Sequence, residues 1–129
     1  MKKVSWGDDA FQQMHAKFMT VSHYAGDTGS LYADTVYVGT SNVDDHNEHG
    51  VPAGKDWVQS GILINFHPEL KASFDKYFDL IYDHADDQTA FHEAVRQEHA
   101  NGTLNYDDQH FSSYFTPIPV EPEELHVYS

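Results

Sequence analysis

The chain has 129 residues, of which 40% are hydrophobic and 14% aromatic, so an apolar core is available and disorder of the whole chain is excluded. Cysteine is absent, which excludes disulfides and thiol chemistry, and no run approaches the ~20 apolar residues that cross a membrane. Twenty-one Asp and Glu against seven Lys and Arg give a net charge of −14 with histidine neutral, which disfavours direct nucleic-acid binding because such a field repels phosphate.

The first predicted element is a helix over about residues 9–22. Its apolar residues recur at spacings of three, four and three, which places them on one helical face, and an aspartate before them can cap the helix. Glycines at both ends of the next short segment predict a turn over residues 26–30. The apolar stripe of the helix consists of Phe11, Met14, Phe18 and Val21.

A long polar interval, residues 41–56, follows a predicted strand over residues 31–40 that is rich in Tyr, Val and Thr. The interval exceeds common hairpin loops, and loops of this length tend to be functional or mobile. It contains carboxylates and imidazoles that can bind a divalent metal ion, although neither a His-Glu-x-x-His motif nor an EF-hand pattern is present. A metal site is one interpretation of this loop, and a solvated or partner-contacting loop is the other. The candidate ligands are Asp44, Asp45, His46, Glu48 and His49.

The core is predicted from residues 57–82, where an apolar strand over residues 57–66 leads directly into an amphipathic helix. Strict alternation of apolar and polar residues fails at 62–64, which favours a strand covered on both faces. Pro68 suits the first turn of a helix, because the N–H that it lacks would be unsatisfied there. One face of that helix then collects Leu70, Phe74, Tyr77, Phe78 and Ile81.

A further helix is predicted from about Gln88 to Asn101, with Asp86 or Asp87 as its cap and Gly102 as its stop. Its predicted apolar face consists of Ala90, Phe91, Ala94 and Val95. Residues 104–120 are too aromatic for a free tail, and two prolines at their end favour an extended run or edge strand.

This order of elements predicts a single compact α+β domain over residues 1–120, with a small antiparallel sheet packed against about three helices. Residues 121–129 are predicted to form an acidic C-terminal tail. Because a two-stranded ribbon is marginal alone, a further strand near residues 114–120 or a homodimer partner is expected. We expect a soluble cytoplasmic protein with no membrane association.

Three functions are compatible with the sequence, which carries neither a phosphate-binding glycine loop nor a Gly-x-Ser-x-Gly elbow. The leading hypothesis is a non-catalytic interaction module whose acidic surface meets a basic protein, as an immunity-like, antitoxin-like or nucleic-acid-mimic inhibitor. The first alternative is a metal-binding protein or small metal-dependent enzyme that uses the 44–49 loop, and no cofactor other than such a metal is predicted. The second alternative is a ligand-binding domain whose aromatic pocket is lined by Tyr32, Tyr37, Trp57, Tyr77 and Tyr114.

Overall fold

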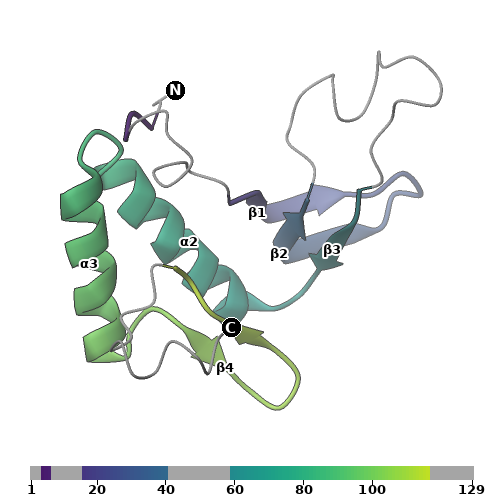
Figure 1. Ribbon diagram of the computed structural model, residues 1–129. Helices are drawn as coiled ribbons and strands as arrows, with labels where there is room; N and C mark the ends of the chain where they lie inside the picture. The colour runs from purple at the N-terminus through teal and green to yellow at the C-terminus, as the bar shows by residue number, and fades with distance from the viewer. Residues whose placement is uncertain (1–3, 7–15, 41–58, 117–129) are drawn as a thin grey trace. The chain divides into compact units, whose positions relative to one another are not determined.

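The computed structural model describes residues 4–6, 16–40 and 59–116 (Figure 1). Within these residues the chain has the predicted α+β class, with a three-stranded antiparallel sheet, a two-stranded hairpin and two helices where about three were expected. The chain divides into two units, which are described separately here as the sheet unit, His15–Lys71, and the helical unit, Met1–Met14 with Ala72–Ser129. The predicted acidic tail lies outside the described residues.

The sheet unit contains three strands in the order β1, β2, β3, and both neighbouring pairs are antiparallel. β1 is Phe18–Ala25, β2 is Leu31–Gly39 and β3 is Gly61–Ile64. The predicted turn at 26–30 joins β1 to β2, and Gly29 adopts a φ of 84° there, a conformation that costs a residue with a Cβ. β2 is therefore the central strand, and its Val36 is fully buried.

The predicted helix over residues 9–22 is wrong for Phe18 to Ser22, which belong to β1. The helical spacing of Phe18 and Val21 competes with a segment rich in residues that favour strands, and pairing with β2 decides between them. Phe18 pairs with Val38 and Tyr24 with Tyr32, so each large side chain of β1 gains a neighbour across the ladder. Residues 9–15 of the predicted helix lie outside the described residues.

β3 is shorter than the strand predicted over residues 57–66, and it is not covered on both faces. Ile62 is 65% exposed and Leu63 is 53% exposed, so the apolar run does not mark a buried strand. β3 lies at the edge of the described sheet, where β2 is its one neighbour. Its first residue, Gly61, pairs with Gly39, and a β-carbon on either glycine would lie 2.5 Å from the hydroxyl oxygen of Tyr37. The ring of Tyr37 therefore packs over Gly39 and Gly61, in the space that side chains at these two positions would occupy.

An unusual backbone joins the sheet to the helix α2, Pro68–Asp83. Asp34 and Phe66 both have positive φ, 49° and 61°, although neither is glycine. The N–H of Phe66 donates to the carbonyl of Ala33 at 2.8 Å, and the next N–H donates to the carbonyl of Asp34 at 3.1 Å, which fixes both residues in this conformation. A bulky residue in the left-handed region costs of order 1–3 kcal/mol, so the structure around Phe66 must outweigh this cost.

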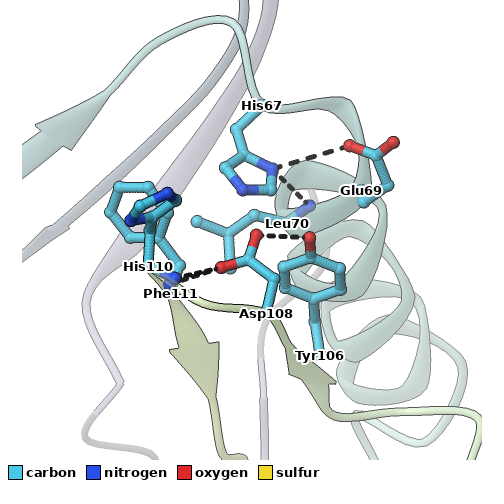
Figure 2. Close-up of polar contacts among 7 residues, drawn as sticks. All are labelled: His67, Glu69, Leu70, Tyr106, Asp108, His110 and Phe111. Atoms are coloured by element: carbon cyan, nitrogen blue, oxygen red, sulfur yellow. Dashed lines mark hydrogen bonds and ion pairs between the residues drawn. The ribbon is translucent and has the colours of Figure 1, made fainter.

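The N-cap of α2 is a histidine. Figure 2 shows the ring of His67 beside the first turn of α2, where its Nδ1 accepts a hydrogen bond from the backbone N–H of Leu70 at 3.2 Å. Pro68 then occupies the first helical position, as predicted. A carboxylate oxygen of Glu69 lies 3.7 Å from the same Nδ1. The imidazole thus takes the place that Ser, Thr, Asp or Asn commonly fills.

The helical unit is built on a hairpin of α2 and α3, Gln88–Asn101, which Figure 1 shows as neighbouring helices. The predicted caps of α3 are confirmed, since the Asp87 side chain accepts from the N–H of Ala90 and Gly102 ends the helix with a φ of 68°. Trp6 stacks on Phe91 with ring centroids 4.5 Å apart and donates its indole N–H to the carbonyl of His84. In the described part of the chain, neither helix is long and apolar enough to cross a lipid bilayer.

The core of this unit includes most of the predicted helical faces. Tyr77 stacks on Phe115 with centroids 4.5 Å apart, and burial raises the pKa of the Tyr77 phenol because the phenolate would lose its solvation. Phe78 is the exception on the predicted face of α2, since it is exposed and packs only loosely against Tyr82. The buried apolar residues are Tyr77, Ile81, Ala85, Phe91, Val95, Leu104 and Phe115.

A short hairpin, β4 at Tyr106–Asp107 and β5 at Ser112–Ser113, is tied to α2 by buried serines. Ser73 donates its hydroxyl to the carbonyl of Leu104 at 2.6 Å, and its Oγ lies 2.9 Å from the Oγ of Ser113. The Oγ of Ser113 in turn accepts from the N–H of Tyr106. The two buried serine hydroxyls are therefore both hydrogen-bonded, which is what burial requires.

The turn of the same hairpin is organised by Asp108 (Figure 2). One carboxylate oxygen accepts from the N–H groups of His110 and Phe111, each at 2.6 Å, and the other accepts from the Tyr106 hydroxyl at 2.5 Å. This strand pair precedes the region 114–120 where a strand was predicted, and 114–116 are not in a strand. The strand that completes the three-stranded sheet is instead β1.

Candidate functional site

Four exposed aspartates gather where α2 ends and α3 begins. Asp79 and Asp83 lie one turn apart on α2, and Asp86 and Asp87 follow in the connection to α3. The segment 79–87 contains no Lys or Arg. These four residues are called the acidic surface below.

Asp83 lies in the last turn of α2, where a helix tolerates a carboxylate least, and Asp79 lies one turn before it. The C-terminal end of a helix carries a partial negative charge, so an anion there is destabilising by roughly 0.3–1 kcal/mol. Like charges at a spacing of four residues add a further penalty of about 0.2–0.5 kcal/mol. The last turn of α2 carries no basic residue that would offset either effect. Asp87, by contrast, stabilises α3 as its N-cap.

The nearest lysine along α2 is engaged elsewhere. The Nζ of Lys76 lies 2.7 Å from a carboxylate oxygen of Glu98 on α3, and the same carboxylate accepts from the Thr103 hydroxyl. These hydrogen bonds, that from Lys76 foremost, hold the pKa of Glu98 below its usual value. Lys76 therefore links the two helices, and Asp79 and Asp83 are left as an acidic face.

The five aromatic residues predicted to line a pocket belong to different parts of the molecule. Tyr32 and Tyr37 lie on β2 in the sheet unit, where Tyr32 stacks on Tyr24 and Tyr37 covers the glycine pair. Tyr77 is buried in the helical unit, and its hydroxyl donates to the carbonyl of Thr116 at 2.9 Å. Tyr114, also in that unit, is 70% exposed, and Trp57 lies outside the described residues. Whether these five residues line one pocket stays a prediction.

All five candidate metal ligands in the 44–49 loop lie outside the described residues. Within the ranges 4–6, 16–40 and 59–116, no three His, Asp or Glu side chains are grouped so that they could hold a metal ion. The metal hypothesis therefore stays a prediction about the 44–49 loop.

No protein-family model, no curated protein and no solved structure matches this chain. The functional argument consequently depends on the site geometry alone.

Sequence reasoning used the net charge but did not single out the acidic surface. The available signal was the segment DLIYDHADD, whose four aspartates fall at the end of one predicted helix and the start of the next. From the sequence, Asp86 and Asp87 are predicted only as caps, a role that Asp87 performs.

Proposed function

We propose that this chain is a non-catalytic interaction module and that its acidic surface binds a basic protein. The observation that carries the proposal is the position of Asp79 and Asp83, exposed carboxylates at the negative end of α2. Charges placed against the helix dipole reduce the stability of the free protein. A cationic partner surface would remove both that penalty and the repulsion between the two carboxylates.

The chemistry of the surface favours arginine-rich partners. A carboxylate accepts two parallel hydrogen bonds from a guanidinium group, and a row of carboxylates presents several such sites in a fixed arrangement. The net charge of −14 would accelerate association with a basic protein at low ionic strength and weaken the complex as salt is added. An immunity-like, antitoxin-like or nucleic-acid-mimic inhibitor would act in this way from the cytoplasm.

Two triple variants with the same charge change test the proposal. The first replaces three aspartates of the acidic surface, D79N/D83N/D86N, and keeps Asp87 because it caps α3. The second replaces three exposed carboxylates elsewhere, D27N/E69Q/E93Q. Both variants carry three fewer negative charges, so any difference between them reports position and not net charge.

The measurement is native mass spectrometry of each untagged protein purified from its own cytosol at low salt. We expect a basic protein to accompany the wild type and D27N/E69Q/E93Q, and to be lost from D79N/D83N/D86N. The free D79N/D83N/D86N protein should also unfold at a higher denaturant concentration than the wild type, because repulsion has been removed. Equal retention of the partner by the two variants, or equal loss, would refute the acidic surface as the site.

A further inference from the structure

The sheet unit contains a separate open pocket, at the end of the β1–β2 hairpin next to the turn at 26–30. Its volume is about 420 Å³, within the range of roughly 300–1,000 Å³ that small-molecule sites occupy. Its walls are largely apolar, and three aromatic rings supply much of them, those of Tyr24, Tyr32 and Phe66. No member of the acidic surface lines this pocket.

The three rings follow one another in a row. Tyr24 and Tyr32 stack with centroids 4.9 Å apart and an interplanar angle of 22°, and Phe66 follows Tyr32 at 5.9 Å and 35°. The row is fixed at its first ring, because the Tyr24 hydroxyl donates to the side-chain oxygen of Asn65, which also accepts from the hydroxyl of buried Thr35. The ring of Tyr24 is therefore positioned before any ligand arrives.

Phe66 is held in the pocket wall at an energetic cost. Its φ of 61° is strained for a residue with a side chain, and the residue is 63% exposed, so it gains little from burial. Glycine or asparagine would adopt the same backbone with less strain. A strained, exposed aromatic residue beside a pocket is better explained by a bound ligand than by the stability of the sheet.

The side chains of the pocket also limit the class of ligand. Neither Lys nor Arg lines it, and an anion would in addition meet the negative field of the chain. Neither Asp nor Glu lines it, so a cation would find no counter-charge in its walls. His23 is the one side chain in the lining with a ring nitrogen to offer as donor or acceptor. We propose that this pocket binds a small, uncharged molecule with a flat aromatic ring, which extends the row formed by Tyr24, Tyr32 and Phe66.

The test is a titration followed by amide NMR shifts, with indole as the probe. Cyclohexanol serves as an apolar control without an aromatic ring, and benzoate as an aromatic control with a negative charge. We expect indole to produce saturable shifts at Tyr24, Tyr32, Ala33 and Phe66, and we expect neither control to do so. F66G should bind indole about five- to tenfold more weakly, as loss of one aromatic contact implies.

Two further variants keep the result interpretable. F66N also accepts a left-handed backbone, so it replaces F66G if the glycine variant does not fold. F78A removes an exposed phenyl ring from α2 in the helical unit and should leave indole binding unchanged. F66G itself should be at least as stable as the wild type, because glycine relieves the strain at φ 61°.

Several outcomes would overturn the proposal. Shifts that do not saturate, or that F78A reduces as much as F66G does, would show non-specific association with exposed aromatic residues. Equal binding of cyclohexanol or benzoate would refute the ligand class. A concentration-dependent dimer in sedimentation velocity that F66G abolishes would show that a second copy of the chain, and not a small molecule, covers this pocket.

Discussion

The helical unit and the sheet unit distribute their apolar and charged residues in opposite ways. In the helical unit, Ile81, Phe91 and Val95 are buried, and the described residues 72–116 carry nine Asp and Glu against two Lys and Arg. In the sheet unit, Leu31, Ile62 and Leu63 are exposed, and the described residues carry three Asp and Glu against two Lys. The helical unit thus combines most of the buried apolar residues with most of the charge, although it also exposes Phe78 and Tyr114. The sheet unit exposes apolar side chains and carries little charge.

This difference separates two kinds of binding. Charge on a rigid helical hairpin suits recognition of a basic protein, since its carboxylates are held on regular structure. Exposed apolar and aromatic side chains on a small sheet suit a ligand that is itself apolar and uncharged. The following predictions test whether the two units differ in this way.

The largest effect is expected from one substitution made in both units. Ile81→Ala removes a buried side chain from the helical core and should lower the free energy of unfolding by about 2–5 kcal/mol. Ile62→Ala makes the same chemical change at a 65% exposed position and should cost less than about 1 kcal/mol. Urea denaturation followed by circular dichroism measures both. Similar losses would contradict the contrast between a closed and an open unit.

A smaller effect is expected from the buried serines of the helical unit. Ser73→Ala leaves the Leu104 carbonyl without its hydroxyl donor and should destabilise by about 1–3 kcal/mol. Ser112→Ala, on β5 next to Ser113, is the control: its side chain is exposed and its hydroxyl donates to the exposed carboxylate of Asp107, so the change should cost less than about 0.5 kcal/mol. The double variant S73A/S113A should lose less than the sum of its single variants, because the two hydroxyls act as one chain. Strict additivity would show that the serines act separately.

The N-cap of α2 provides a test of about 1 kcal/mol. His67→Ala removes the acceptor for the Leu70 N–H and should lower stability by roughly that amount, whereas His67→Asn should retain most of it. His110→Ala is the control, since that side chain is exposed and only its backbone N–H bonds to Asp108. Thermal unfolding compares the three. If the asparagine variant is as unstable as the alanine variant, the ring of His67 contributes packing and not a cap.

The sequence predicted the helices because their signals are local. Helix formation depends mainly on residues that are close together in the sequence. This holds for the apolar faces of α2 and α3, for the Asp87 cap and for the Gly102 stop. The first five residues of β1 are predicted as helix because Phe18 and Val21 also fit a helical period, and only pairing with β2 resolves the ambiguity. The exposure of Ile62 and Leu63 likewise depends on the place of β3 in the sheet order, which periodicity does not encode.

The candidate sites were less predictable than the fold. The pocket at Tyr24, Tyr32 and Phe66 depends on a cross-strand pair and on a positive φ at a phenylalanine, which no residue preference would suggest. The sequence analysis names Tyr32 as a pocket residue, whereas Tyr24 falls between the predicted helix and the predicted turn, and Phe66 ends a strand that is predicted to be buried. The acidic surface was visible as four aspartates in a short segment, and what the structure adds is their place at the end of α2.

The smallest predicted effect concerns pH and the bond that joins the two helices of the helical unit. Hydrogen bonds from Lys76 and Thr103 lower the pKa of Glu98 in the folded protein, so the folded state binds fewer protons there than the unfolded state. The stabilisation is therefore present above the unfolded pKa of about 4.3 and is lost as pH falls through the lower folded value.

Glu98→Gln removes this stabilisation at every pH. We expect the variant to be less stable than the wild type by under about 1 kcal/mol near neutral pH, because the pair is partly exposed. The gap should close between about pH 5 and pH 3, as the wild-type carboxyl becomes protonated. Glu93→Gln, which removes a carboxylate 3.5 Å from Arg96 on the exposed face of α3, is the matched control and should cost less at neutral pH. The urea midpoints of the wild type and both variants, measured at several pH values, test this prediction. If the stability difference between Glu98→Gln and the wild type persists in acid, Glu98 stabilises the pair of α2 and α3 by packing. The charge of Glu98 would then contribute nothing to folding.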